Sequence, residues 1–477
     1  MKGDMTKEAL EYQRARCNHW NNAARKTPSW GGYYHQRLAQ VYQFLVPPGL
    51  KVLEVGCGTG DLLAALEPNL GVGVELSEKM ASLAAQRHPE LHFIVADAHR
   101  LCLEESFDAI ILSDLVNDIW DVQSLLQEIT SLTDSSTRVI LNTYSRLWEM
   151  PLTLAQKLRL ATPMLPQNWL TLEDVKGLLK LADFEIIRTW QEILWPLPTP
   201  LFGPFLNRFL VRIWPFNCFA LTNFVIARPM PKTLPPPKPP PVSVIVPARN
   251  EAENIHHILH RMPEMGEGTE IVFVEGHSRD NTYAVIERCM AEHPERKVKL
   301  LRQPGVGKAD AVRLGFSQAR GDILMILDAD LTVPPEDLPR FYDVLCSGKG
   351  EFVNGVRLVY PMEKEAMRYL NLMGNKFFSL SFSWLLGQPI KDTLCGTKVL
   401  WKSDYDRISK NRPYFGDFDP FGDFDLLFGA SKLNLKLVEV PIRYRERKYG
   451  QTNIQRWKHG WLLLRMVLFA AGRIKFV

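Results

Sequence analysis

Short apolar runs alternate with stretches of helical spacing, and this rhythm occurs twice along the 477-residue chain. The runs are VLEVG, GVGVEL, HFIVADA and FDAIILSDL in the first half, then VSVIVPA, EIVFVEG, VKLL and ILMILDAD in the second. Such runs are typical of strands buried in a parallel sheet with crossover helices. The pattern predicts two α/β domains. The halves share this rhythm but no motif, so no internal repeat is expected.

A proline-rich stretch, RPMPKTLPPPKPPP, separates the two halves. Such a run favours extended polyproline II and lacks the N–H groups that helices and sheets need. A ligand for an SH3-like module would look similar, but a linker requires no partner. The predicted organisation is a domain over residues 1–228, a linker over 229–241, a domain over 242–455 and an amphipathic segment over 456–477.

Composition and charge narrow the class of protein. Hydrophobic residues make up 46% of the chain and charged residues 23%, as in soluble globular proteins. A net charge of +4 is too small for a dedicated nucleic-acid binder. Seven scattered cysteines without a C-x-x-C pair argue against a zinc module and a disulfide framework. With no apolar run near ~18 residues and no signal-like start, we expect a cytoplasmic protein.

A glycine-rich turn follows the first apolar strand, in the sequence KVLEVGCGTG at residues 51–60. Glycines there let a ligand approach the backbone, although they also suit a plain tight turn. The next strand ends in Glu75, about twenty residues past the loop, where a carboxylate can accept both ribose hydroxyls. A third strand ends near Asp97, which suits an adenine amino group.

With FDAIILSDL as a fourth strand, this order of motifs resembles the class I methyltransferases that use S-adenosylmethionine, over roughly residues 30–228. The resemblance implies a Rossmann-like fold with that donor. It assigns Glu54, Gly56, Gly58 and Gly60 to the methionine end, Glu75 to the ribose, and Asp97 with Ala98 to the adenine. A nicotinamide-binding fold is the rival, but the loop reads G-x-G-x-G rather than G-x-G-x-x-G.

Fewer residues of the sequence point to the methyl acceptor. The resemblance places Asp114 near the methyl group, and Asp114, Asp118 and His35 are the candidate bases. Alignment of donor and nucleophile can suffice for methyl transfer, so no base is obligatory. The stretch from Trp148 to Trp214, rich in tryptophan, leucine and proline, is a cap, extra core helices or a hydrophobic acceptor site.

After the linker, polar residues again follow the strands. VSVIVPARNE places Pro247, Asn250 and Glu251 at a strand end, and the next strand delivers Glu275 and then a polar loop that could cradle a nucleoside. The loop residues are Ser278, Asp280 and Thr282, and the later GVGKADAVRLGF segment offers Lys308 and Arg313 to phosphates.

The third feature of this half is Asp328-Ala-Asp330, at the mouth of the apolar strand ILMIL. Two carboxylates one residue apart at a buried strand end are costly without a cation. Magnesium prefers one or two carboxylates together with phosphate oxygens and water. The pair therefore predicts Mg²⁺ or Mn²⁺ bound to the diphosphate of a nucleotide-sugar.

These motifs together resemble family 2 glycosyltransferases of the GT-A fold, and within them the dolichyl-phosphate mannose synthase group, from about Val242 to Ile454. The resemblance implies sugar transfer from a nucleotide-sugar to a polyprenyl phosphate. It assigns Pro247, Asn250, Glu251, Glu275 and Lys308 to the nucleotide-sugar, Asp328 and Asp330 to the metal, and Arg357, Arg368, Arg447 and Lys448 to phosphates. Glu275-Gly276 stands where the family usually has paired aspartates, so the base of the nucleotide stays open.

The acceptor decides whether a base is needed. A phosphate is already a nucleophile, whereas a hydroxyl needs a general base, for which Asp392, Asp423 and Asp425 are candidates. The stretch 367–386 and the C-terminal IQRWKHGWLLLRMVLFAAGRIKFV resemble interfacial helices. They predict peripheral contact with the inner face of the cell membrane, unless they pack into the core or a homo-oligomer.

The function predicted is therefore bifunctional. One half builds a polyprenyl-phosphate sugar, and the other methylates a glycan or lipid. Transfer to a glycan or lipid hydroxyl, with the methyltransferase half as a non-catalytic binding module, is the alternative.

Overall fold

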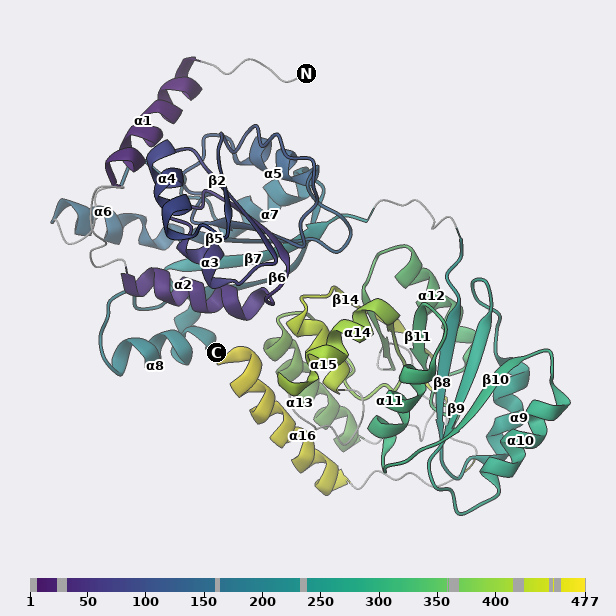
Figure 1. The fold of residues 1–477 in the computed structure, drawn as a ribbon. Helices are drawn as coiled ribbons and strands as arrows, with labels where there is room; N and C mark the ends of the chain where they lie inside the picture. The colour runs from purple at the N-terminus through teal and green to yellow at the C-terminus, as the bar shows by residue number, and fades with distance from the viewer. Residues whose placement is uncertain are drawn as a thin grey trace. The chain divides into compact units, whose positions relative to one another are not determined.

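A computed structural model describes residues 7–23, 32–158, 164–231, 238–357, 359, 369–414, 424–445, 449 and 456–476. At 369–372, 413 and 456–459 it describes the backbone alone. The chain forms two compact units, the first of residues 1–230 together with Phe476 and the second of residues 231–475, and each has its own sheet (Figure 1).

The N-terminal unit is built on a seven-stranded sheet of order β3-β2-β1-β4-β5-β7-β6. The first five strands run parallel, whereas β7 is antiparallel to both β5 and β6. The strands are β1 Lys51–Val55, β2 Leu70–Glu75, β3 His92–Val95, β4 Ala109–Ser113, β5 Arg138–Tyr144, β6 Phe184–Glu192 and β7 Thr222–Pro229. The sequence rhythm therefore located β1 to β4 but neither the fifth parallel strand, β5, nor the antiparallel strands β6 and β7.

Both faces of this sheet are covered, which explains the continuous apolar runs. Successive residues of β4 alternate between two core clusters: Ile110 and Leu112 pack on one face and Ile111 on the other. Helices α5 and α7 cover the first face, and α2 and α3 the second. The helices are α1 Lys7–Ala23, α2 Gly32–Leu45, α3 Asp61–Ala65, α4 Glu78–Arg87, α5 Val122–Thr130, α6 Glu149–Lys157, α7 Leu172–Leu181 and α8 Phe202–Arg208, with short 3₁₀ turns η1 Arg146–Trp148, η2 Leu210–Arg212 and η3 Phe216–Phe219.

The C-terminal unit has a second seven-stranded sheet, of order β10-β9-β8-β11-β13-β12-β14. Strands β8 to β11 are parallel, and β13 runs antiparallel between β11 and β12. The strands are β8 Val242–Ala248, β9 Thr269–Glu275, β10 Lys297–Arg302, β11 Ile323–Ile326, β12 Phe352–Val356, β13 Lys398–Trp401 and β14 Leu437–Pro441. Because β8 lies between β9 and β11, the strand order reverses there and leaves a crevice at the carboxyl ends.

Helices α9, α10 and α12 share one core cluster with this sheet, while α11 packs on β8 and β9. A Cβ on Gly315 of α11 would lie 2.5 Å from Ile245, so glycine allows this helix to approach β8 closely. The helices are α9 Ala252–Arg261, α10 Thr282–Glu292, α11 Lys308–Gln318, α12 Leu338–Cys346, α13 Tyr369–Leu386, α14 Lys402–Lys410, α15 Phe424–Lys432 and α16 Arg456–Ala470, with η4 Pro335–Asp337, η5 Arg412–Tyr414 and a π-helical η6 Ala471–Lys475.

The two stretches with interfacial character form α13 and α16, which pack against each other. Each has buried and exposed apolar residues: Phe382 and Met466 are buried, whereas Leu380 and Trp461 are exposed. Within the part of the chain that the structure describes, no helix has both the length and the apolar character to cross a membrane.

Candidate active sites

The glycine loop of the N-terminal unit adopts backbone conformations that favour glycine. Gly56, Gly58 and Gly60 all have φ between +55° and +77°, the left-handed region in which a Cβ is strained. The loop is fastened to the neighbouring strand, because the Gly56 N–H donates to the Val74 carbonyl at 2.7 Å. The loop thus bends back over the carboxyl ends of β1 and β2, where the sequence predicted the methyl donor.

Glu75, predicted to bind the ribose, lies at the end of β2 and is buried. Its two carboxylate oxygens accept from the Gly58 N–H and the Ser77 N–H, each at 2.9 Å. Burial raises the pKa of Glu75, against the lowering effect of these backbone donors. The structure therefore joins the predicted ribose ligand to the glycine loop.

Glu54 is buried in β1, and burial raises the pKa of its carboxyl to about 8. Its Oε2 is buried and lacks a hydrogen-bond partner among the described residues. A buried oxygen in this state fits a cationic or hydrogen-bond-donating ligand, such as the methionine ammonium of S-adenosylmethionine. The donor set and the cradle thus fit this methyl donor.

Asp97, predicted for the adenine, accepts from the His99 ring at 2.8 Å. Burial tends to raise the pKa of Asp97, but the bonds to His99 hold it below its usual value. The Gln13 amide of α1 also donates to it, at 2.5 Å. The neighbouring Ala98 is buried in the core beside it.

Helix α1 is the element that the sequence analysis missed. Arg16 pairs with Asp118 at 3.1 Å, and Asn21 accepts from Ser77 at 2.7 Å. Together with the bond from Gln13, these contacts place α1 across the carboxyl ends of β2, β3 and β4. Polar residues at helical spacing in the first 23 positions were the only available signal, and they resemble an ordinary exposed helix.

Asp114, the residue predicted near the methyl group, follows β4 with φ +55°. Its Oδ1 accepts from Tyr34 at 2.8 Å and from Asn142 at 2.5 Å. Burial raises the pKa of Asp114, although His35, Tyr34 and Asn142 oppose this effect. Of the three candidate bases, Asp118 is paired with Arg16, Asp114 is held by Tyr34 and Asn142, and His35 is next to Tyr34.

In the C-terminal unit, β8 and β9 end side by side, with Ala248 in register with Glu275. The loops that follow are tied together. The Asn250 N–H donates to Ser278 at 3.0 Å, the Asn250 side chain accepts from the Arg279 N–H at 2.7 Å, and Glu275 accepts from the Ser278 N–H at 2.5 Å. The predicted nucleoside residues therefore form one cluster.

Glu251 and Pro247 belong to the same region. The Glu251 N–H donates to Thr282 at 3.0 Å, and its carboxylate accepts from Asn254 at 2.7 Å. Thr282 in turn donates to Asp280 at 2.5 Å. Pro247, which has no N–H, lies in β8 opposite Val274. These bonds fix the backbone of both loops at the edge of the crevice.

Asp328 follows β11 and forms an ion pair with Lys308, the first residue of α11, at 2.7 Å. Burial tends to raise the pKa of Asp328, but Lys308, with smaller effects from Lys398 and Arg357, holds it below the usual value. Asp328 is therefore a carboxylate at neutral pH. Positive charge from α11 already neutralises it.

Gly396 lies directly against this ion pair. A Cβ there would stand 2.0 Å from Asp328 Oδ2 and 2.6 Å from the Lys308 ammonium. Only glycine leaves room for the carboxylate and the ammonium in this arrangement. Lys398, two residues further on, is fully buried and donates to the Cys395 carbonyl. Gly396 and Lys398 were not among the site residues predicted from the sequence.

Asp330, the second carboxylate of the predicted metal pair, accepts from the Thr332 N–H at 3.1 Å and from the Thr332 hydroxyl at 2.7 Å. Leu331 between them has φ +54°. The described residues contain no group of three His, Cys, Asp or Glu side chains placed to hold a metal ion. Two carboxylates nevertheless fit Mg²⁺ or Mn²⁺, because such ions commonly complete their coordination with substrate phosphates and water.

Arg357 uses its guanidinium for Asp392, with Nε and Nη2 donating at 2.7 and 2.8 Å. Asp392 is fully buried, and burial alone would raise its pKa, but Arg357 holds it low. Asp425 is paired with Arg313 at 3.3 Å and Arg412 at 3.5 Å. These contacts pair Arg357, Arg313 and both carboxylates within the domain, and their predicted roles stay predictions.

Arg368, Asp423, Arg447 and Lys448 lie outside the described residues, so their predicted roles stay predictions.

Comparison with known proteins identifies both units. Residues 52–135 match the methyltransferase domain family, and residues 243–408 match glycosyl transferase family 2. The chain joins a methyltransferase domain to a family 2 glycosyltransferase domain. The predicted resemblance to both families and the two predicted α/β domains are thus confirmed.

Curated relatives match the glycosyltransferase domain. A dolichol-phosphate mannosyltransferase of Pyrococcus furiosus is 33% identical over 221 residues, 45% of this chain and 59% of the relative. An undecaprenyl-phosphate 4-deoxy-4-formamido-L-arabinose transferase of Edwardsiella ictaluri is 32% identical over 215 residues, 44% of this chain and 62% of the relative. The enzyme of the same name from Pseudomonas fluorescens is 35% identical over 111 residues, which are 22% of this chain and 33% of the relative. The chain thus spans less than two thirds of these relatives.

Solved structures match each domain. Magnesium protoporphyrin IX methyltransferase from Synechocystis, with bound SAH, matches at 19% identity and a TM-score of 0.27, covering 48% of this chain and 89% of its own. Glucosyl-3-phosphoglycerate synthase from Mycobacterium tuberculosis, in complex with Mn²⁺, UDP and glucosyl-3-phosphoglycerate, matches at 17% identity and a TM-score of 0.37, covering 49% and 80%.

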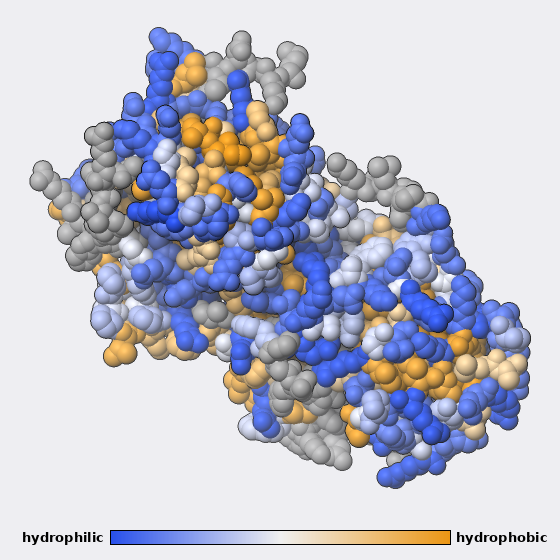
Figure 2. Space-filling view, viewed as in Figure 1, coloured by the Kyte–Doolittle hydropathy of each residue, from blue (hydrophilic) through white to orange (hydrophobic). Residues whose placement is uncertain are grey.

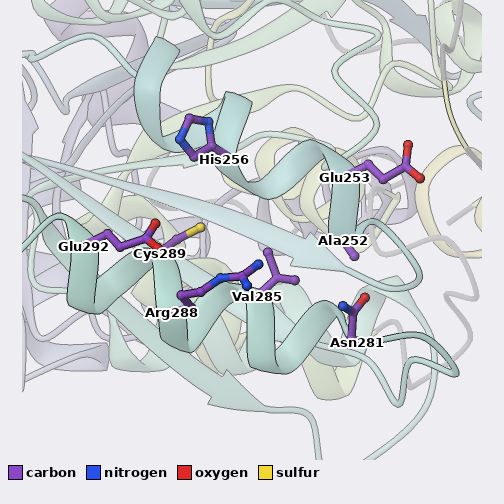
Figure 3. Close-up of a pocket in the computed structure, with 8 residues that line it drawn as sticks. All are labelled: Ala252, Glu253, His256, Asn281, Val285, Arg288, Cys289 and Glu292. Carbon is purple, nitrogen blue, oxygen red and sulfur yellow. The ribbon is translucent and has the colours of Figure 1, made fainter.

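A pocket of about 460 Å³ lies between α9 and α10 of the glycosyltransferase domain. Figure 3 shows His256 of α9 and Arg288 and Glu292 of α10 along its walls, with Glu253 and Asn281 also lining it. The pocket is lined by these two helices and not by Asp328 or Asp330. The predicted metal-binding carboxylates therefore lie at the strand end and not in this pocket.

We expect Gly396→Ala to abolish nucleotide-sugar binding by the glycosyltransferase domain. The added methyl group would displace Asp328 and Lys308, which it would approach to 2.0 and 2.6 Å. Calorimetry with a nucleotide diphosphate and Mn²⁺ measures the loss. Gly374→Ala is the matched control, because a Cβ at Gly374 has no neighbour within 4 Å. Equal affinities of both variants would contradict the assigned site.

The methyltransferase domain should lose stability as pH rises from about 5 to 8. The folded state keeps the Glu54 proton up to a pKa of about 8, whereas the unfolded chain releases it near the ordinary value of 4.5. Since the folded state binds more protons in this window, stability falls by at most about 1.4 kcal/mol per pH unit. Glu54→Gln should remove this slope in chemical denaturation measured from pH 5 to 8. A slope unchanged by the substitution would rule out the buried, protonated Glu54.

Proposed function

We propose that the C-terminal domain transfers a sugar from a nucleotide diphospho-sugar to a polyprenyl phosphate, with inversion and with Mg²⁺ or Mn²⁺. The observation that carries this proposal is the cluster of Asp328, Asp330 and Lys308 at the carboxyl end of β11. Two matched relatives are named for dolichol phosphate and undecaprenyl phosphate, which supports this class of acceptor.

The proposed reaction is a single displacement. An oxygen of the acceptor phosphate forms a bond to the anomeric carbon while the bond from that carbon to the diphosphate oxygen breaks. Attack from the opposite side inverts the anomeric centre. A divalent cation bound by Asp328 and Asp330 would offset charge on the departing diphosphate. Lys308, at the start of α11, adds a positive charge next to Asp328.

The surroundings of the candidate bases favour a phosphate acceptor over a hydroxyl. A phosphate is ionised at neutral pH and needs no base, whereas a hydroxyl does. Asp392 is fully buried and bound by Arg357, and Asp425 is paired with two arginines. Neither described carboxylate is therefore well placed to take a proton from a sugar or lipid hydroxyl. Transfer to a hydroxyl remains the second candidate, because Asp423 lies outside the described residues.

For the N-terminal domain we propose methyl transfer from S-adenosylmethionine to a glycan or lipid. S-adenosylmethionine would supply the electrophilic methyl group. Glu54, the glycine loop and Glu75 would hold it, supported by the loop geometry and the bonds of Glu75. Asp114, whose Oδ1 is held by Tyr34 and Asn142, would accept the proton of an attacking hydroxyl at its other carboxylate oxygen. The alternative is a domain that binds the donor without catalysis.

The proposed substrates also suggest a location. Nucleotide-sugars and S-adenosylmethionine are water-soluble, whereas a polyprenyl phosphate lies in a bilayer. We therefore propose that the protein works at the cytoplasmic face of the cell membrane, in peripheral contact with it.

Asp330→Asn should lower sugar transfer by about 10²–10³-fold, because it removes one of the two negative charges proposed to bind the divalent cation. The assay screens nucleotide-sugars with Mn²⁺ and polyprenyl phosphate and follows lipid-linked product. Asp322→Asn, an exposed aspartate just before β11, is the control and should retain activity. Full activity of Asp330→Asn would exclude the metal role. Product that forms only with a glycan or lipid hydroxyl would favour the second candidate.

Gly58→Asp should abolish S-adenosylmethionine binding in calorimetry. A Cβ at Gly58 meets no atom within 4 Å, so the new side chain would point into open space and place a charge beside Glu75, which already binds the Gly58 N–H. Gly49→Asp, equally open and also at a glycine with positive φ, should bind normally. Unchanged affinity in Gly58→Asp would refute the proposed donor site.

A further inference from the structure

The segment from Leu201 to Phe219 exposes an unusual set of side chains. All of its exposed residues are apolar, proline or cysteine, except Arg208. Leu201 is 88% exposed, Trp214 78% and Phe219 62%. We call these exposed side chains the apolar surface. Large apolar patches on soluble proteins commonly mark a site of interaction.

The apolar surface is continuous. Phe202 and Phe205 lie three positions apart on one side of α8, and Phe209, directly after the helix, continues the same spacing. The rings of Phe205 and Phe209 lie 5.9 Å apart. Helix α8 packs on η2, and η2 on η3. Figure 2 shows hydrophobic residues gathered over α8, at the lower left of the view.

Polar side chains of the same segment point inward and hold it in this orientation. Asn207 is buried, accepts from the Trp195 N–H at 2.7 Å and donates to the Trp195 carbonyl at 2.6 Å. Arg212 forms an ion pair with the buried Glu192 at 2.5 Å. Asn207 and Arg212 thus bond within the domain, and the side chains that face outward are mainly apolar.

We propose that the apolar surface docks on an anionic lipid bilayer and lies in its interface. No Asp or Glu occurs between Ile193 and Arg228, so no carboxylate of this segment repels anionic headgroups. Arg208 is exposed and positively charged, and its Nε donates to the carbonyl of Phe476, whose ring lies 5.3 Å from that of Phe209. Phenylalanine and leucine insert at the headgroup boundary, and tryptophan prefers it. With seven residues, α8 lies in the interface and does not cross it.

A protein partner fits this surface less well. Protein interfaces carry about one hydrogen bond per 100–200 Å², whereas the exposed side chains of this segment offer little besides Arg208 and the weak donor of Cys218. A lipid bilayer needs no such partners at the depth of the acyl chains. The docking is independent of both proposed catalytic activities.

Two exposed cysteines of the same domain allow a direct test. Cys218 lies within the apolar surface and Cys102 outside it. In the full chain, with the partly exposed Cys17 and Cys346 replaced by serine, an environment-sensitive fluorophore is attached to Cys218 with Cys102→Ser, or to Cys102 with Cys218→Ser. Vesicles of phosphatidylcholine with phosphatidylglycerol should shift the emission of the first protein to shorter wavelength and leave the second unchanged.

Vesicle sedimentation supplies the second measurement. Phe205→Ser/Trp214→Ser should lower the partition coefficient at least about tenfold, because two large apolar side chains no longer leave water. Val95→Ser/Leu181→Ser replaces two other exposed apolar residues of the domain and should bind as the unchanged chain does.

Three results would overturn the proposal. The first is no binding to the vesicles, and the second is binding that Phe205→Ser/Trp214→Ser leaves intact. The third is a shift of the Cys218 fluorophore that rises with protein concentration without vesicles, together with a dimer in sedimentation velocity. That result would assign the surface to a second copy of the chain.

Discussion

In parallel strands that are buried on both faces, polar side chains can reach a ligand mainly at the strand ends. Both domains of this chain follow that constraint. Their carboxyl ends meet at one edge of each sheet, where the strand order reverses next to β1 and next to β8. The glycine loop and Glu75 lie at the first edge, and Lys308 and Asp328 at the second. The same rule thus creates two different sites.

Sequence patterns predicted these edges well, since an apolar run followed by a polar residue marks a strand end. Glu75, Asp97, Asn250 and Asp328 were found in this way. What the pattern could not predict is what packs on the strand ends from distant parts of the chain. Helix α1 reaches Asp97 and Asp118, and Gly396 lies against Asp328. Neither has a local signature that links it to a site.

The pattern also could not separate buried from exposed apolar residues outside the regular strands. The stretch from Trp148 to Trp214 was expected to be a cap, extra core helices or an acceptor site, and the exposure of Leu201 and Trp214 is at odds with core helices alone. Similarly, the resemblance assigned Arg357 to a phosphate, and only the fold shows that its Nε and Nη2 also donate to Asp392. Only the fold shows which partner a charged or apolar side chain has found.

The contact between Gly396 and Asp328 has a consequence for how the glycosyltransferase domain can vary. The missing side chain at position 396 is the space that the carboxylate occupies. A longer acid at 328 would need that space as well, and a side chain at 396 would require a shorter residue at 328. Among related sequences, residues 328 and 396 should therefore change together or not at all. Such covariation would indicate that the carboxylate at 328 lies against residue 396.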